Sequence, residues 1–295
     1  MPASGDGANV TAKILFQFDV DSLASTFDAV VAIDSGVDHL VTRAGVTRDN
    51  VETLVHGAIF TRGIDQLHQT AIFVGGSDVA VAEQVTAKIS ECFFGPLRVS
   101  VLQDASGCNT TAAAAVIYAG KHIDYASSRV AVLAGTGPVG KRVAELVARL
   151  GGSVRLASRN LQRATEAANS VVERVTGADV EPFGIVNTSQ SLDMLDQCDA
   201  VIACGASGVV LLDAATIAKA KSIKVAIDLN AVPPAGIEGI AAMDKAKLIE
   251  GIVCYGALGV GGLKMKIHRA AIKSLFSGND RILDASEILQ IGQSL

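Results

Sequence analysis

The stretch VAVLAGTGPVGKRVAELVARLGGSVRLASRN, residues 130–160, decides the fold of this chain. Five apolar residues lead into a glycine-rich turn, which is followed by the amphipathic segment KRVAELVARL; the turn is Gly135-Thr136-Gly137-Pro138-Val139-Gly140. In such a strand–turn–helix, the first glycine allows a tight turn and the second lets a pyrophosphate approach the backbone. The third lets helix and strand pack closely. The context therefore predicts a dinucleotide-binding turn and not an ordinary loop.

The end of the next strand predicts which dinucleotide binds. About 20 residues after such a turn, an Asp or Glu commonly binds the ribose hydroxyls of NAD. This sequence instead has Ala157-Ser158-Arg159. No carboxylate would repel a 2′-phosphate there, and Ser158, Arg159 and Arg163 can bind one. The alternative for the two arginines is a solvated first helical turn. NADP is the expected cofactor, and use of NAD stays open.

The composition narrows the class of protein. Hydrophobic residues make up 49% of the chain, yet no apolar run reaches the roughly 18 residues of a membrane span. A net charge of −5 without a basic stripe argues against a nucleic-acid partner. The cysteines form no CxxC pair and the histidines lack ligand spacing, so we expect reduced thiols in the cytoplasm and no metal. The initial MPASGDGANV predicts a polar extension and not a signal peptide.

Alternating strand-like and helix-like segments predict an α/β fold. The expected strands lie at residues 13–18, 71–74, 97–102, 130–134, 154–157, 200–204 and 224–229. The expected helices run over 51–60 with Thr47 as a cap, over 78–90, from Asn109 or Thr110, after 137, after 160, and over 263–276 and 284–293. Gly256–Gly262 is expected to be a second glycine-rich turn. We expect a substrate domain at 1–125, completed by C-terminal helices 263–295, and a Rossmann-type domain at 126–262.

Several motifs, taken together, resemble one family. They are LFQFDVD, TAIFVGGSD, FFGPLRVS, GCNTTAAA, VLAGTGPVG, NAVPPAGIEGI and YGALGVGGLKMKIHRA, and they span nearly the whole chain in one order. The sequence thereby resembles the NADP-dependent methylenetetrahydromethanopterin dehydrogenases of bacterial one-carbon metabolism. The resemblance implies two domains with a deep cleft, a homo-oligomer of three or six subunits, and hydride transfer between tetrahydromethanopterin-bound carbon and a nicotinamide. Some relatives also accept methylenetetrahydrofolate, and a sister branch tolerates NAD.

The implied chemistry agrees with what the sequence lacks. A methylene carbon between two nitrogens can lose hydride unaided, because the nitrogen lone pairs stabilise the resulting cation. The protein then has to position the two rings and exclude water, and it needs no obligatory general base. This explains why the sequence shows neither a Ser/His/Asp set nor a metal constellation.

Polar side chains near the ends of the expected strands are the candidate site residues, because ligands bind outside the carboxyl ends of parallel strands. On the substrate side we expect Asp19, Asn109, Thr110, Thr111, Lys264 and His268, and on the cofactor side Gly205, Asn230 and Pro233. Their alternative roles are structural: a turn carboxylate for Asp19, helix caps for 109–111, and plain turns for Asn230 and Pro233. Lys264 is the candidate catalytic residue, with a solvated surface lysine as its alternative. A cation at the start of a helix opposes the helix dipole, which favours function over stability there.

Two other functions stay open. One is a methylenetetrahydrofolate dehydrogenase, with or without hydrolysis of the methenyl product. The other is a non-catalytic NADP-binding redox sensor, which would bind cofactor without turning over any reduced pterin.

Overall fold

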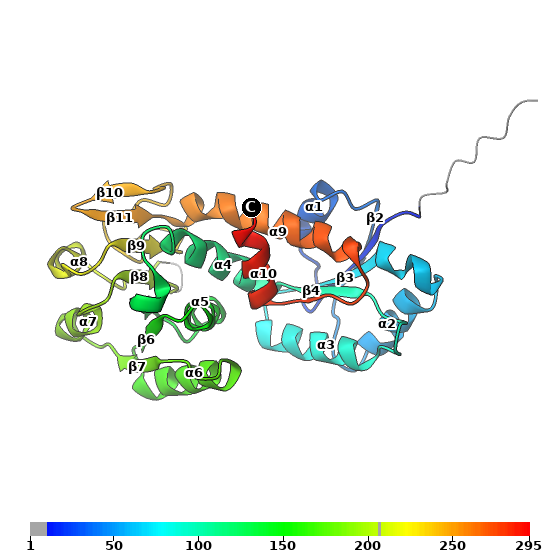
Figure 1. Cartoon of the computed structure of the whole chain (residues 1–295), viewed down its shortest axis with the longest axis horizontal. Helices are drawn as coiled ribbons and strands as arrows, with labels where there is room; N and C mark the ends of the chain where they lie inside the picture. Colours follow the sequence, from blue (N-terminus) through cyan, green and yellow to red (C-terminus); the bar gives the residue numbers. More distant parts are fainter. Residues whose placement is uncertain (1–10, 206–207) are drawn as a thin grey trace, which may run out of the picture. The chain divides into compact units, whose positions relative to one another are not determined.

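The computed structural model describes residues 11–205 and 208–295; the predicted N-terminal extension, residues 1–10, lies outside the described residues. The chain forms two compact units (Figure 1). Unit 1 comprises the residues up to Ser106 together with Arg269–Asp284, and unit 2 comprises Gly107–His268 and Ala285–Leu295. The sequence predicts a boundary between residues 125 and 126 and assigns residues 263–295 to the first domain, whereas only Arg269–Asp284 of that segment belongs to unit 1. The difference arises at helix α4 (Cys108–Ala119), which packs with unit 2 through a buried hydrogen bond between Asn109 and Arg142.

Unit 1 is built on a parallel sheet of five strands in its described part, in the order β12-β4-β3-β1-β2. The strands are β1 (Ile14–Asp19), β2 (His39–Arg43), β3 (Thr70–Gly75), β4 (Ser100–Gln103) and β12 (Ile282–Leu283). The helices are α1 (Thr26–Asp34), α2 (Val51–Ile59) and α3 (Val79–Glu91). The central strand β3 is buried along its whole length, as expected for a parallel strand covered on both faces. Helix α2 begins after Asn50 and not at the predicted Thr47 cap.

Unit 2 has the strand order β10-β11-β9-β8-β5-β6-β7 within its described residues, and the strands are parallel except that β10 runs antiparallel to β11. The strands are β5 (Arg129–Leu133), β6 (Ser153–Ser158), β7 (Val180–Gly184), β8 (Ala200–Ala203), β9 (Val225–Asp228), β10 (Lys247–Ile249) and β11 (Ile252–Tyr255). From β7 to β11 this is the 3-2-1-4-5-6 order of the Rossmann fold. The order places a topological switch point between β5 and β8, where such folds bind dinucleotides.

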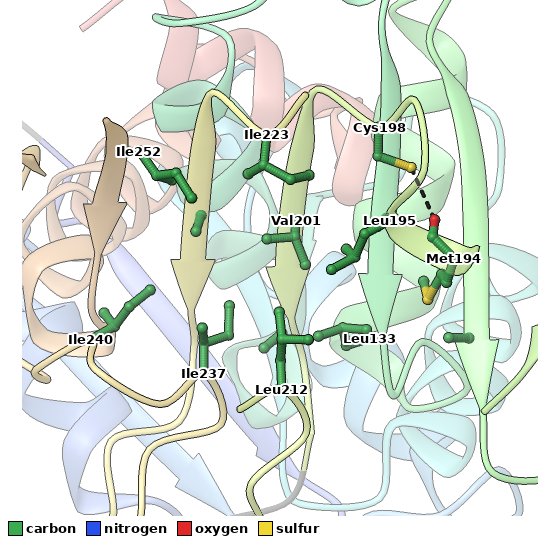
Figure 2. Close-up of a cluster of buried hydrophobic side chains, with 14 of the residues drawn as sticks. Leu133, Met194, Leu195, Cys198, Val201, Leu212, Ile223, Ile237, Ile240 and Ile252 are labelled. Atoms are coloured by element: carbon green, nitrogen blue, oxygen red, sulfur yellow. Dashed lines mark hydrogen bonds between the residues drawn. The ribbon is translucent and has the colours of Figure 1, made fainter. Parts of the chain in front are cut away.

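The helices of unit 2 include α5 (Pro138–Arg149), α6 (Leu161–Arg174), α7 (Thr188–Leu195), α8 (Ala214–Lys219) and α10 (Ala285–Gln293). Figure 2 shows the apolar core under α7, where Leu133 and Val201 of the sheet meet Met194, Leu195 and Cys198. The Cys198 thiol donates a hydrogen bond to the Met194 carbonyl oxygen at 3.2 Å. Burial raises the pKa of this thiol to about 11, so it stays protonated at neutral pH.

Helix α9 runs from Ala257 to Ser274, so residues 257–262 are helical and the prediction of a second glycine turn over Gly256–Gly262 was wrong. The backbone amides of Leu258 and Gly259 donate to the Ala242 carbonyl oxygen at 2.8 and 3.2 Å. These bonds satisfy amides of the first turn, which have no partner inside a helix. Within the described ranges, no helix is long and apolar enough to cross a membrane.

Candidate functional site

The glycine-rich turn between β5 and α5 has three glycines with different surroundings. A Cβ added to Gly135 would lie 2.7 Å from Leu156 Cγ, and one added to Gly140 would lie 2.5 Å from Gly135 Cα. A Cβ on Gly137 would meet nothing within 4 Å. The outer two glycines are therefore required by packing, whereas Gly137 leaves its backbone open for a ligand. Pro138 and Val139 open helix α5, whose first amides favour a phosphate.

A cavity of about 690 Å³ lies at this turn. Four of the predicted cofactor residues line it: Thr136, Ser158, Arg159 and Arg163. The other eight do not: Gly135, Gly137, Pro138, Val139, Gly140, Gly205, Asn230 and Pro233. The rest of its lining comes from the ends of β5 and β6, from the segments after β5, β6 and β7, from α7 and from the segment before α8: Leu133, Ala134, Ala157, Asn160, Ile185, Val186, Asn187, Ser191, Val209, Val210, Leu211, Leu212 and Asp213. The apolar wall formed by Val186, Val209 and Val210 was not predicted from the sequence. Large apolar residues in short polar loops are the signal that could have revealed it.

The β6 end of the cavity can hold a phosphate. Asn160 caps helix α6, since its side-chain oxygen accepts from the Arg163 amide at 3.1 Å. The Ser158 hydroxyl oxygen accepts from the Asn160 amide at 3.2 Å. Arg159 and Arg163 are exposed, and the first turn of α6 carries no acidic residue. Two guanidinium groups at the positive end of a helix fit the 2′-phosphate of NADP.

One carboxylate does line the cavity, but its charge is engaged elsewhere. Asp213 caps α8, and its Oδ1 accepts from the Thr216 amide at 2.7 Å. Hydrogen bonds from Thr216 lower the pKa of the Asp213 carboxyl. It lies after β8 and not at the end of β6, where an NAD-selective acid is expected.

The loop after β9 is organised by its own side chains. Asn230 donates from Nδ2 to the Pro234 carbonyl oxygen at 2.9 Å and accepts from the Val232 amide at 3.0 Å. Asp228, which the sequence analysis did not single out, accepts from the Gly236 amide at 2.7 Å. Burial raises the pKa of the Asp228 carboxyl, while backbone amides oppose that rise. An acid that ends an apolar strand was the available signal.

Gly205 and Pro233 have no established ligand role. A Cβ on Gly205 would lie 2.6 Å from Leu211 Cδ1, so a side chain there would require Leu211 to move. Pro233 is exposed, and it joins Pro234 through a cis peptide bond. For these two residues and Asn230, contact with the cofactor stays a prediction.

Asp19 of unit 1 shapes a turn. Its carboxylate is fully buried and accepts from the amides of Asp21 at 3.0 Å and Ser25 at 2.9 Å. Ser25 in turn caps α1, so Asp19 fixes the connection from β1 to that helix. This geometry matches the structural alternative, and a substrate contact stays a prediction.

Helix α4 begins at Cys108 after Gly107, so neither Asn109 nor Thr110 is its N-cap. Asn109 is fully buried, and its side-chain oxygen accepts from Arg142 Nε at 2.8 Å. Thr110 is also buried, and Thr111 is partly exposed. Asn109 thereby connects the start of α4 to α5. Roles for residues 109–111 in substrate binding remain predictions.

Arg142 belongs to an ionic cluster that surrounds the buried Glu145 and joins α5 to Arg174 of α6. Glu145, only 3% exposed, pairs with Arg142 at 3.7 Å, Arg149 at 3.0 Å and Arg174 at 3.6 Å. Three guanidinium groups compensate the cost of burying one carboxylate. The cluster fixes the orientation of the helix that begins at the glycine-rich turn.

Lys264 lies in the third turn of α9 and not at its start, which corrects the prediction from its own helix dipole. It is partly exposed and instead approaches Gly107, the N-cap residue of α4. A Cβ on Gly107 would lie 2.7 Å from Lys264 Nζ. A cation therefore does lie at a helix N-terminus, but the helix is α4. His268, one turn further along α9, is buried.

Among the described residues, no group of three or more His, Cys, Asp or Glu side chains could hold a metal ion. The candidate site in unit 2 therefore consists of a cavity of about 690 Å³ with Arg159 and Arg163 at one end, and of Lys264 beside the N-terminus of α4.

Comparisons with known proteins agree with this geometry. Residues 26–106 match the family model described as "Methylene-tetrahydromethanopterin dehydrogenase, N-terminal". The chain is 42% identical over 285 residues to "Bifunctional protein MdtA" of Methylorubrum extorquens, covering 96% of this chain and 99% of that protein. It is 29% identical over 264 residues to the "NAD(P)-dependent methylenetetrahydromethanopterin dehydrogenase" of the same species, covering 87% and 89%.

A solved structure supports the fold. Shikimate 5-dehydrogenase from Listeria monocytogenes, in complex with shikimate and NAD, is similar with a TM-score of 0.53 at 10% identity. The match covers 95% of this chain and 96% of that one. At this identity the likeness shows the two-domain Rossmann-type fold alone.

Proposed function

Because the chain belongs to the methylenetetrahydromethanopterin dehydrogenase family, we propose that it is an NADP-dependent methylenetetrahydromethanopterin dehydrogenase. The reaction is reversible hydride transfer between the methylene carbon of the reduced pterin and the nicotinamide. The observation that carries the proposal is the 42% identity to a curated family member over almost the full length of both chains. The cofactor cavity of unit 2 supplies independent support.

The preference for NADP over NAD rests on the β6 end of that cavity. Ser158, Arg159 and Arg163 line it, and α6 directs its N-terminus toward the same region. A 2′-phosphate there gains charge-assisted hydrogen bonds, whereas the ribose hydroxyls of NAD meet no carboxylate acceptor in the first turn.

The residues on the substrate side act by orientation in this proposal. NADP, when bound, takes up the hydride, and the nitrogen lone pairs of the substrate stabilise the cation that is left. The Lys264 ammonium group orients the pterin by donating a hydrogen bond to the carbonyl oxygen of the pterin, directly or through a bridging water. It transfers no proton. Correct mutual orientation of two reactants can lower a barrier by about 7 kcal/mol or more.

Steady-state kinetics with both carriers and both nicotinamides test the proposal. We expect the highest kcat/KM for methylenetetrahydromethanopterin with NADP. A higher kcat/KM with methylenetetrahydrofolate would identify the protein as a methylenetetrahydrofolate dehydrogenase. A parallel assay of methenyl-pterin hydrolysis would show whether the enzyme also hydrolyses its methenyl product. Binding of NADP without turnover of either carrier would support the redox sensor and overturn the dehydrogenase.

We also propose a homo-oligomer, a trimer or hexamer. The support is the apolar composition, with 49% hydrophobic and 19% charged residues, together with the family. Sedimentation of the intact protein at micromolar concentration measures its mass, and a monomer would contradict the proposal.

A further inference from the structure

We propose that Gly107 is a positioning residue that seats the ammonium group of Lys264. The kinetic part of this inference rests on the proposed function, because it takes Lys264 to orient the substrate. The contact itself does not depend on that function.

The space that a side chain at Gly107 would need is taken by Lys264. A Cβ built there would lie 2.7 Å from Nζ and 3.0 Å from Cε of Lys264, with Thr110 Oγ1 next at 3.8 Å. Unstrained contacts to carbon are about 3.5–4.0 Å long, so the ammonium would have to move by roughly 1 Å. The end of a lysine side chain can make this movement without disturbing the surrounding backbone.

Backbone conformation alone does not require glycine at this position. Gly107 has a φ of +59°, in the left-handed region that favours glycine. The preceding residue, Ser106, has a φ of +54° and carries a side chain. Ser106 and Gly107 therefore share the left-handed conformation. Only at Gly107 does another side chain, Lys264, occupy the Cβ position. The close approach of Lys264 is what distinguishes them.

The Lys264 ammonium group lies beside the N-terminal end of helix α4. Gly107 is the N-cap of α4, a helix of 12 residues, and the N-terminal end of a helix is positive. An ammonium group beside it is repelled by that dipole. Thr110 donates its hydroxyl to the Gly107 carbonyl oxygen at 3.3 Å, which ties the seat to the first turn of the helix. A functional group works best when surrounding groups hold it in place, and the close approach of Lys264 to Gly107 gives the ammonium such a position.

The test is a double-mutant cycle of Gly107→Ala and Lys264→Ala in the full-length protein. Gly107→Ala should lower kcat on the order of 10- to 100-fold, the loss that a 1 Å displacement produces, with the NADP Kd unchanged. In the Lys264→Ala background the same change should lower kcat by no more than about twofold, because two residues that act together are not additive.

The matched control is Gly95→Ala. Gly95 has a φ of +54°, close to that of Gly107, but a Cβ there would meet nothing within 4 Å. It reproduces the backbone strain without the contact, and kcat should stay at the wild-type value. If Gly107→Ala lowered kcat no more than Gly95→Ala, or equally in both backgrounds, the positioning role would be overturned while the proposed function stood.

Thermal unfolding of the same four proteins provides a readout without turnover. Gly107→Ala should lower Tm less when residue 264 is alanine, because the clash is then absent. An equal decrease in Tm in both backgrounds would show that Lys264 does not occupy the space beside Gly107. If the wild type turned over neither carrier, the proposed function would fail, and the Tm cycle would still decide whether Lys264 occupies this space.

Discussion

Two glycine-rich segments of unit 2 have similar composition and different structures. Gly135–Gly140 forms the turn between β5 and α5, whereas Gly256–Gly262 leads into and continues through the first turns of α9. In the first segment, strand and helix approach each other closely around Gly135 and Gly140. In the second, a Cβ on Gly256 would collide with the Ala241 carbonyl oxygen, and one on Gly259 with that of Asp244.

The comparison shows that closely spaced glycines indicate where another part of the chain packs against the backbone. They do not by themselves indicate whether the segment is a turn or a helix. Residues 241–244 lie against the start of α9, and their carbonyl groups accept from its first amides; the Gly256 amide donates to the Asp244 oxygen at 2.8 Å. A helix can pass through glycines when a neighbouring backbone both needs the space and supplies hydrogen bonds. In the first segment one glycine, Gly137, faces open space, and that position alone leaves its backbone accessible to a ligand.

The largest expected effect is that of Gly137→Val. No atom lies within 4 Å of its Cβ position, so the fold should tolerate the change. The added isopropyl group should block the pyrophosphate and weaken NADP binding by at least about 100-fold. A cofactor titration paired with a thermal melt measures both quantities.

Gly140→Ala is the contrasting variant in the same turn. Its Cβ would lie 2.5 Å from Gly135 Cα, so this change should lower Tm as well as affinity. Normal NADP binding by Gly137→Val would show that Gly135–Gly140 is only a turn. The proposed difference in ligand access between this segment and Gly256–Gly262 would then be wrong.

Gly259→Ala should destabilise the protein without acting on the cofactor. The new methyl group meets the Asp244 backbone, and overpacking of this kind costs about 3 kcal/mol. Urea unfolding gives the free energy, and the NADP Kd of the folded protein should match that of the wild type. A stable Gly259→Ala variant would mean that the close approach of residues 241–244 is not required.

Arg159→Ala tests the ligand predicted for the first segment. Loss of a charge-assisted hydrogen bond should raise the NADP Kd by a factor corresponding to about 2 kcal/mol, and change the NAD Kd little. Fluorescence titration with both nicotinamides makes the comparison. An equal loss of affinity for NADP and NAD would show that the 2′-phosphate does not bind at this end of the cavity.

The smallest expected effect is a gain in stability from Gly262→Ala. This residue is exposed inside α9, and nothing lies within 4 Å of its Cβ position. Glycine in a helix interior costs roughly 0.5–1 kcal/mol relative to alanine, and the variant should recover that amount in urea unfolding. A loss of stability would indicate that this glycine, too, is needed for packing.

The sequence predicted the elements that have strong periodicity. The apolar runs of β1, β3, β5, β6, β8 and β9 and the amphipathic α5 were all anticipated. The edge strand β2 was missed because its residues are half exposed and not strongly apolar. Strand β7 was missed because it contains Pro182, which is tolerated at a sheet edge. The start of α9 was missed because its partner, residues 241–244, is identified only by the fold.

The candidate site residues also fall into two groups, those that belong to a local motif and those whose contacts depend on distant parts of the sequence. Gly135, Gly137, Gly140 and Arg159 could be predicted together as one candidate cofactor site because they belong to a local motif of about 30 residues. The apolar wall at Val186, Val209 and Val210 lies outside that motif. Asn109 was expected to face a ligand, yet its oxygen bonds Arg142, which lies 33 positions away. Pairings at such distances in the sequence depend on helix packing, which neither composition nor spacing reveals. The apposition of Lys264 and Gly107 belongs to this second class.

The order of the chain through the two units affects how the protein is made. Strand β4 ends at Gln103, but its outer neighbour β12 begins at Ile282. At translation rates of about 5–20 residues per second, the ribosome needs roughly 10–40 s to add the residues between them. During that interval the outer edge of the first sheet has unpaired backbone groups, which are prone to aggregation. Strand β12 therefore closes an edge that was synthesised long before, and a nascent chain truncated ahead of this strand leaves that edge open.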